Sequence, residues 1–232
     1  MKKKADVVIV GTGVAGLFSA LNLPDDKEII MITKSDAESS DSFLAQGGIC
    51  VLRDEQDYDS YFEDTMRAGH YENRKESVDI MIRSSGKIIE DLVGYGVEFE
   101  KDGEAFAYTR EGAHSRPRIL FHADVTGKEI TSKLLARVRE NVTIYEYTTM
   151  TDILEENGKC AGITVKTQSG EESSIYADYT ILASGGIGGL YQHSTNFPHL
   201  TGDALEIAKK HGIRLEHTDY VQIHPTTLYS KK

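Results

Sequence analysis

The sequence predicts an α/β protein in which a parallel sheet is extended by an antiparallel β-meander. Two β-branched apolar runs, DVVIV at 6–10 and EIIMIT at 28–33, flank a segment of helical periodicity. Continuous apolar runs of this length are typical of strands buried on both faces of a parallel sheet, so the three segments predict a βαβ unit. Short strands separated by the turn sequences ENGK and QSGE indicate the meander.

Composition excludes some classes of function. Of 232 residues, 39% are hydrophobic and 27% are charged, and 26 Lys and Arg against 37 Asp and Glu give a net charge of −11. That balance argues against nucleic-acid binding. No apolar run reaches the roughly 20 residues of a membrane span, so no membrane partner is expected. Cys50 and Cys160 have neither CxxC nor metal-ligand spacing, which favours a reduced, cytoplasmic setting and no metal site.

The predicted elements divide the chain into four consecutive parts. They are the βαβ unit at 5–34, a helical and loop insert at 41–140, the meander at 141–177, and a return strand with one more helix at 178–232. Within the insert, an amphipathic helix over roughly 75–93 is predicted from apolar residues on one face, namely Val78, Ile82, Ile89 and Leu92. Thr126 and Glu129 have the spacing of a capping box at the start of a second helix.

Gly11, Gly13 and Gly16 form G-x-G-x-x-G between the first strand and its helix. The first glycine permits a tight turn, the second lets a pyrophosphate approach the backbone, and the third allows close packing of helix on strand. In a βαβ unit this motif predicts a Rossmann-like dinucleotide site; a glycine-rich turn without a ligand is the alternative. Thr33 and Lys34 occupy the place of the usual ribose-binding acid, so the motif alone does not choose between NAD, NADP and FAD.

Three further features each have two interpretations. The loop SDSFLAQGG at 40–48 supplies hydroxyl, amide and backbone N–H groups that suit a cofactor, but it is equally an ordinary flexible loop. His224, before a proline, is either a ligand for a substrate carboxylate or a hydrogen-bonded structural histidine. Glu111, in TREGAHS, either faces a cationic ligand group or forms a surface salt bridge with Arg110, Arg116 or Arg118.

Six motifs in order resemble the flavoprotein family of succinate dehydrogenase, fumarate reductase and L-aspartate oxidase. They are DVVIVGTGVAGL, SFLAQGGI, TREGAHSRPRILFHADVTGKEI, YTILASGGIGGLY, TGDALEIAKKHG and QIHPT, and together they span nearly the whole chain. The resemblance implies an FAD-binding domain. It also implies the residues that line the cofactor, which are Gly11, Thr12, Gly13, Val14, Ala15, Gly16, Lys34, Asp41, Ser42, Phe43, Leu44, Ala45, Gln46, Gly47, Gly48 and Asp203.

The same resemblance implies an activity. TREGxHSxxRIL is similar to the aspartate oxidase version of the motif, in which Glu111 matches the acid that reads the amino group and His224 binds a substrate carboxylate. The implied reaction converts L-aspartate, or another dicarboxylate, with oxygen or fumarate as acceptor, and feeds quinolinate synthase in NAD biosynthesis. Asp41 or Ser42 stands where some members carry a flavin-linked histidine, so non-covalent FAD is expected.

The resemblance further implies that this chain corresponds to the N-terminal portion of such an enzyme. The capping domain and a catalytic arginine of the family are expected after QIHPT and are absent from this chain. We therefore expect the isolated chain to bind FAD weakly and to turn over poorly. A soluble fumarate reductase or succinate dehydrogenase flavoprotein and a non-catalytic FAD-binding fragment are the alternatives.

Overall fold

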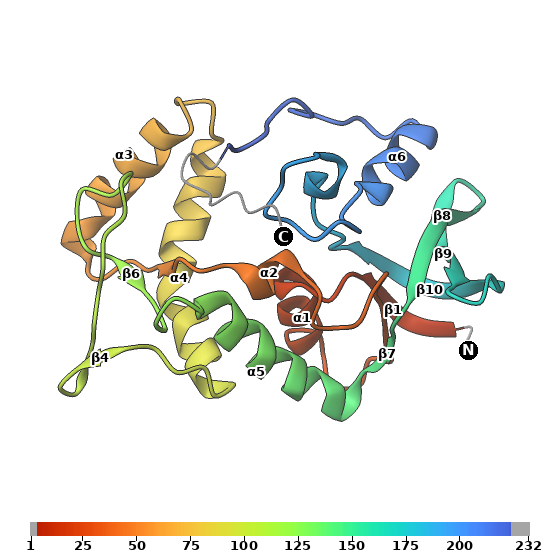
Figure 1. Ribbon diagram of the computed structural model, residues 1–232, viewed down its shortest axis with the longest axis horizontal. Coiled ribbons are helices and arrows are strands. Elements are labelled where there is room, and N and C mark those ends of the chain that lie inside the picture. The colour runs from red at the N-terminus through yellow and green to blue at the C-terminus, as the bar shows by residue number, and fades with distance from the viewer. Residues whose placement is uncertain (1–3, 224–232) are drawn as a thin grey trace.

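A six-stranded sheet forms the centre of the computed structural model, which describes residues 4–223 (Figure 1). Its strand order is β7-β2-β1-β10-β9-β8, with β7, β2, β1 and β10 parallel and β9 and β8 antiparallel. The strands are β1 (Lys4–Val10), β2 (Ile29–Ile32), β7 (Thr143–Tyr145), β8 (Thr148–Glu156), β9 (Lys159–Thr167) and β10 (Glu172–Leu182).

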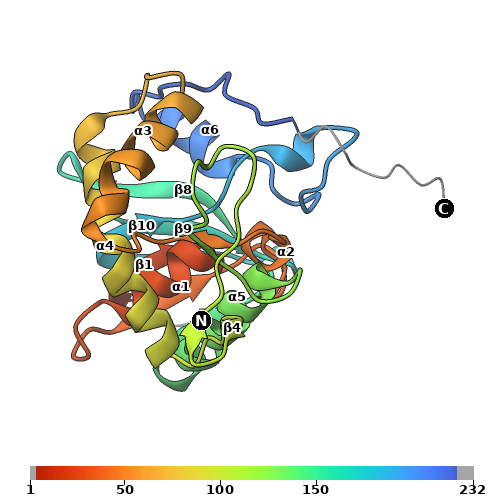
Figure 2. The same cartoon turned by 90° about the vertical axis from the view of Figure 1, so that its left-hand side faces the viewer.

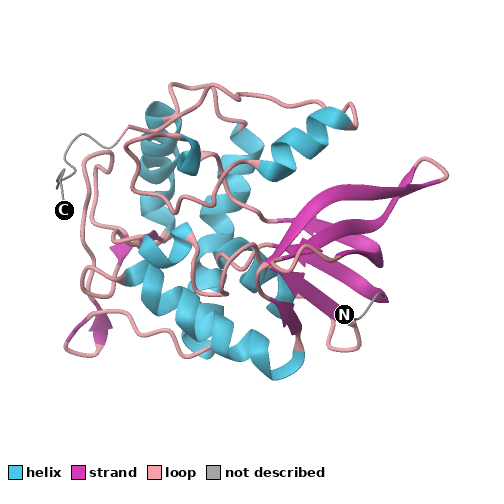
Figure 3. Ribbon diagram, turned by 45° about the vertical axis from the view of Figure 1, so that its right-hand side comes forward, coloured by secondary structure: helices cyan, strands magenta, loops and turns pink. Residues whose placement is uncertain are grey.

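The helices are α1 (Val14–Leu21), α2 (Asp41–Leu44), α3 (Tyr58–Ala68), α4 (Lys75–Gly94), α5 (Thr126–Asn141) and α6 (Asp203–Lys210), with 3-10 turns η1 (Glu55–Asp57) and η2 (Gly188–Leu190). Helices α1, α4 and α5 share the core on one face of this sheet, whereas α6 packs against β8 in the core on the other face (Figures 2 and 3). Two small antiparallel pairs complete the fold: β3 (Ile49–Cys50) with β6 (Ile119–Leu120), and β4 (Lys101–Asp102) with β5 (Ala105–Phe106).

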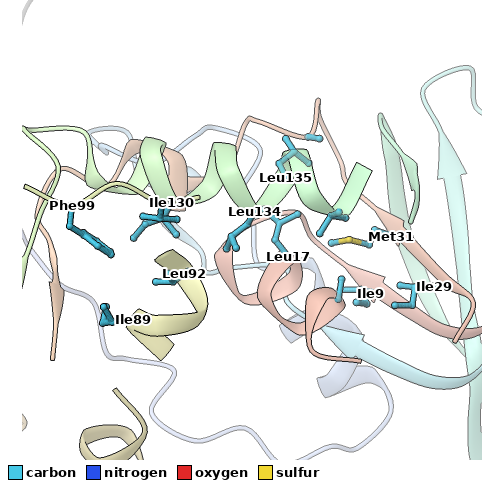
Figure 4. Close-up of a cluster of buried hydrophobic side chains, with 14 of the residues drawn as sticks. Ile9, Leu17, Ile29, Met31, Ile89, Leu92, Phe99, Ile130, Leu134 and Leu135 are labelled. Atoms are coloured by element: carbon cyan, nitrogen blue, oxygen red, sulfur yellow. The ribbon is translucent and has the colours of Figure 1, made fainter. Parts of the chain in front are cut away.

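Strand β1 is buried on both faces because its alternate side chains enter two different cores. Val7 and Ile9 face α1, α4 and α5, where Leu17 and Leu134 are fully buried (Figure 4). Val8 and its neighbours on β1 and β2 instead pack against the inner faces of β8, β9 and β10. This two-sided burial explains why the strand sequence is continuously apolar.

The predicted parallel sheet and meander are confirmed, but two strand assignments were wrong. VTIYEYT does not open the meander, because β7 pairs parallel with β2 at the outer edge of the sheet. EESSIYA and YTILA are one strand, β10, whose first half pairs antiparallel with β9 and whose second half pairs parallel with β1. The boundary expected at 177/178 therefore falls inside a single strand. The antiparallel and the parallel pairing of β10 were predicted as belonging to two separate strands.

The helix predictions are confirmed in position, but the capping box was wrong. Thr126 is the first residue of α5, and its Oγ1 accepts a hydrogen bond from the His122 N–H at 2.9 Å. Glu129 accepts from the Glu98 N–H at 3.0 Å instead of closing back on the helix start. Both side chains therefore bind the β6–α5 connection and the segment before β4, which the local sequence pattern does not reveal.

Helix α6 is fixed on β8 by a charged contact. Asp152 bonds Lys210, and its Oδ1 lies 2.6 Å from His211 Nε2. The hydrogen bonds from Lys210 and His211 lower the pKa of Asp152 to about 2. Since the first turn of α6 contains Asp203, this contact also places that residue.

The segment after α6 crosses to the turn between α3 and α4 (Figure 1). Arg74 forms an ion pair with Glu216 at 3.0 Å, and the Tyr220 hydroxyl bonds Glu72. His224 lies outside the described residues.

Candidate functional site

A cavity of about 480 Å³ lies where β1, β2 and β10 end. These are the carboxyl ends of parallel strands, and the chain runs from β1 toward β2 on one side while β10 returns on the other. In open α/β sheets such a switch point is the usual ligand site. The predicted cofactor residues that line the cavity are Gly11, Thr12, Gly13, Val14, Ala15, Lys34, Asp41, Ser42 and Asp203.

The start of α1 presents hydrogen-bond donors to this cavity. Gly13 is the N-cap residue, and the Val14 N–H donates to Ser42 Oγ at 3.0 Å. Among residues 4–223, the N–H groups of Thr12, Gly13 and Ala15 have no acceptor. The Ser40 hydroxyl at the cavity wall is buried and likewise has no partner in the described chain. Unpaired donors at a helix N-terminus fit a pyrophosphate.

Two of the motif glycines are required by close backbone packing. A Cβ on Gly11 would stand 2.3 Å from the Ala183 carbonyl oxygen, and its φ of +112° disfavours other residues. A Cβ on Gly16 would stand 2.1 Å from the Gly11 oxygen, so Gly16 supports the turn without lining the cavity. The turn between β1 and α1 is therefore possible only with glycine at both positions.

Lys34 and Asp203 meet across the cavity. Lys34 Nζ lies 2.7 Å from Asp203 Oδ2 and 2.7 Å from Thr201 Oγ1. The Phe197 N–H donates to Asp41 Oδ1 at 3.0 Å, and His199 Nε2 lies 3.0 Å from the Ser39 oxygen. Sequence reasoning missed residues 196–200, because the only signal there was the TGDA sequence that follows them.

The rest of the predicted cofactor loop lies outside this cavity. Residues 44–48 are exposed, and the remaining predicted positions there are Phe43, Leu44, Ala45, Gln46, Gly47 and Gly48. The Gly127 N–H of α5 donates to the Ala45 oxygen at 2.9 Å, and Lys128 lies over the Phe43 ring. The loop is thus ordered by the first turn of α5.

Glu111 begins a tight turn against this loop. The His114 N–H donates to the Glu111 carbonyl at 3.0 Å, which closes the turn. The carboxylate of Glu111 contacts Gly47, since its Oε1 lies 3.1 Å from where a Gly47 Cβ would stand. Within residues 4–223 Glu111 forms no ion pair, so of its two interpretations the salt bridge to Arg110, Arg116 or Arg118 does not hold there.

Arg118 is instead buried with two other carboxylates. Its side chain has no exposed surface; Nε and Nη2 bind Asp57 at 3.0 and 2.8 Å, and Nη1 binds Asp64 Oδ2 at 2.7 Å. Burial alone would raise the pKa of Asp64, but the hydrogen bonds from Ser115 and Arg118 outweigh it and lower that pKa to about 2. This cluster places the residues after the Glu111 turn, and sequence reasoning did not detect it.

A second cavity, of about 570 Å³, lies between α3, α4 and the β3–β6 pair, and Gly48 and His114 are in its wall. The described part of the chain contains no group of His, Cys, Asp and Glu that could hold a metal ion. None of its helices is long and apolar enough to cross a membrane.

Comparison with known proteins assigns the family. The model of the FAD binding domain family matches residues 6–232. The chain belongs to this family. It is 45% identical over 234 residues to L-aspartate oxidase of Clostridium perfringens, covering 100% of this chain and 53% of that protein. It is 35% identical to L-aspartate oxidase of Bacillus subtilis, covering 98% of this chain and 43% of that protein. The chain spans about half the length of these relatives.

Solved structures with the same fold include oxidoreductases. An E. coli quinol fumarate reductase chain superposes with a TM-score of 0.85 at 25% identity, covering 91% of this chain and 38% of that one. Mycobacterium smegmatis Sdh1 gives a TM-score of 0.81 at 25% identity, covering 90% of this chain and 39% of that one. The predicted α/β fold and its FAD cofactor are thereby confirmed.

The residues present fit this cofactor. The free N–H groups at the start of α1 and the unpartnered Ser40 hydroxyl suit phosphate and hydroxyl oxygens, and the glycine turn leaves the backbone accessible. When bound, FAD supplies the two-electron chemistry, while the chain supplies binding and orientation.

Proposed function

We propose that the protein containing this chain oxidises L-aspartate to iminoaspartate with FAD as the hydride acceptor. Two L-aspartate oxidases aligned over nearly the whole chain support this proposal, at 45% and 35% identity. The observation that carries it is the Glu111 carboxylate, which has no ion pair within the described residues and lies against Gly47, in the loop expected to run along the flavin.

Glu111 gives a physical reason for choosing aspartate over a plain dicarboxylate. L-aspartate carries an ammonium group that succinate and fumarate lack. A carboxylate beside that ammonium attracts it, and does so more strongly as the closing site excludes water. The same charge repels a dicarboxylate that brings no cation. Because Arg118 is already committed to Asp57 and Asp64, it does not neutralise Glu111.

Changing Glu111→Gln tests this role, because it removes the charge and keeps the shape. With FAD bound, we expect L-aspartate to perturb the flavin absorption band of the parent chain anaerobically and to bleach it slowly, since the isolated chain is expected to turn over poorly. In the variant the apparent affinity for L-aspartate should fall about ten- to a hundredfold, as expected for loss of a charged hydrogen bond. Succinate should be bound equally well or better.

The contrary outcome is equally clear. If Glu111→Gln binds L-aspartate and succinate with the same apparent affinities as the parent, Glu111 does not recognise the amino group. If the flavin of the parent responds to neither compound, this chain does not carry the proposed activity. A parent that responds to succinate alone would favour the fumarate reductase or succinate dehydrogenase alternative, whose fold this chain shares.

We further propose that FAD is held without a covalent bond. Asp41 and Ser42 begin α2, where no histidine is available for a flavin linkage, and both are already engaged, with Phe197 and Val14. Acid precipitation of the FAD-loaded chain should release all of the flavin to the supernatant. Yellow colour retained in the washed pellet would contradict this.

Oxygen and fumarate are the proposed electron acceptors, since the relatives include oxidases and a structural neighbour is a fumarate reductase. Supply of iminoaspartate to quinolinate synthase in the cytoplasm, for NAD biosynthesis, follows from the aspartate oxidase assignment as part of the same proposal. His224 remains the proposed ligand of a substrate carboxylate.

A further inference from the structure

The turn that carries Glu111 is anchored by its last residue, His114, and by the next residue, Ser115. His114 Nε2 lies 3.1 Å from Cys50 Sγ, which joins the turn to β3, the strand that follows Gly47 and Gly48 directly. Ser115 joins the same turn to α3: both its N–H and its hydroxyl donate to Asp64 Oδ2, each at 2.7 Å. The turn is thus fixed at two points on different elements.

The Ser115 anchor belongs to a closed ring of hydrogen bonds. Arg118 donates to Ser60 Oγ at 2.8 Å, and Ser60 Oγ lies 2.8 Å from Ser115 Oγ. Because the Ser115 hydroxyl donates its one proton to Asp64, the Ser60 hydroxyl is the donor between the two serines. Arg118 closes the ring at Asp64. Chains of bonds that run in one direction strengthen each other.

The other anchor is only partly satisfied. His114 Nδ1 is buried and has no partner in residues 4–223. Burial raises the pKa of the Cys50 thiol, so the thiol is uncharged in this contact. His114 therefore contributes little net hydrogen-bond energy. Its role is to position the turn, because its ring holds the end of the turn against β3.

We propose that Ser115 and His114 are positioning residues that fix the Glu111 carboxylate against Gly47 and thereby set its selectivity for an amino dicarboxylate. The inference rests on the proposed function, because selectivity has meaning only if Glu111 faces the substrate. Residues 110–113 are exposed, and the Glu111 carboxylate lies against Gly47. Without the anchors the carboxylate would sample many positions, and its charge would be screened by water.

The test compares Ser115→Ala, Ser115→Thr and His114→Phe with the parent in the FAD-loaded chain. Ser169→Ala is the matched control, because Ser169 is a turn serine between β9 and β10 whose hydroxyl, among residues 4–223, bonds only Thr167, at 2.9 Å. Exchange of the His114 amide, which donates to the Glu111 carbonyl, reports the anchoring. Flavin absorption changes with L-aspartate and with succinate report selectivity, and thermal melting confirms the fold.

We expect Ser115→Ala to speed exchange of the His114 amide about tenfold, as loss of a hydrogen bond to a charged acceptor implies. The preference for L-aspartate over succinate should fall by a similar factor while FAD affinity stays within about twofold. Ser115→Thr, which keeps the hydroxyl, should restore both values, and His114→Phe should act in the same direction as Ser115→Ala. Ser169→Ala should change neither.

Unchanged exchange in Ser115→Ala would overturn the proposal. Faster exchange with full selectivity would also overturn it, since the anchors would then be structural alone. Glu111→Gln in the same series separates the two failures. If that variant keeps the parent's selectivity, Glu111 does not set the selectivity and the proposed function has failed. The positioning roles proposed for Ser115 and His114 then fail as well.

Discussion

Replacing Arg118 with Met should lower the free energy of unfolding by about 3–5 kcal/mol, the usual cost of removing one partner from a buried ion pair. Methionine is similar in length, so the loss would come from charge and hydrogen bonds and not from an empty volume. Asp57 and Asp64, whose side chains are 2% and 5% exposed, would be left without the guanidinium. Urea denaturation monitored by circular dichroism measures the change.

Arg116→Met is the matched control for this prediction. Arg116 also approaches Asp57, but at 3.9 Å and with 53% of its side chain exposed. Exposed pairs of this kind contribute about 0–1 kcal/mol. If the two methionine variants are equally stable, the buried cluster does not hold the fold as its geometry indicates.

The Arg118 cluster also implies a pH dependence. Because the pKa of Asp64 is lowered to about 2 from an ordinary value of 3.8, its contribution to stability is complete above pH 4 and is lost as the pH falls toward 2. Without Arg118 the Asp64 carboxylate is easier to protonate. The stability deficit of Arg118→Met should therefore be largest at neutral pH and should shrink over this acid range.

Replacing Gly11 with Ala should have the largest effect on cofactor binding. The new Cβ would stand 2.3 Å from the Ala183 oxygen, in a backbone conformation with φ of +112° that alanine rarely adopts. The ends of β1 and β10 must separate to accept it, and the cavity lies at those ends. We expect FAD affinity to fall by about a hundredfold or more and stability to fall by about 2–5 kcal/mol.

Gly86→Ala is the corresponding control. Gly86 lies within α4, and a Cβ there would meet nothing within 4 Å. Alanine in a helix interior is favoured over glycine by about 0.5–1 kcal/mol, so this variant should be slightly more stable and should bind FAD as the parent does. FAD titration followed by flavin fluorescence measures both variants. Equal FAD affinity in Gly11→Ala and the parent would contradict the role assigned to the turn.

Much of the fold was predictable because its signals are local. Strand β1, the glycine turn and α1 are encoded by consecutive residues whose burial and backbone needs depend on immediate neighbours. The length of α4 follows from its own apolar face. The nature of β10 was harder to predict, because its two halves pair with strands from different parts of the chain. Sequence periodicity shows that a strand is buried but not which strands lie beside it.

The candidate site likewise has features that the sequence predicts and features that depend on the tertiary structure. The sequence by itself determined the glycine turn at which a dinucleotide is expected to bind and, through its ordered motifs, which family and cofactor to expect. Only the tertiary structure decided the partners of the charged groups near Glu111. Arg118 lies seven residues from Glu111 in the chain, yet it binds Asp57 and Asp64, which are 61 and 54 residues away. A guanidinium pairs with the carboxylates that folding brings to it in a buried, well-oriented arrangement, and sequence distance has no part in that choice.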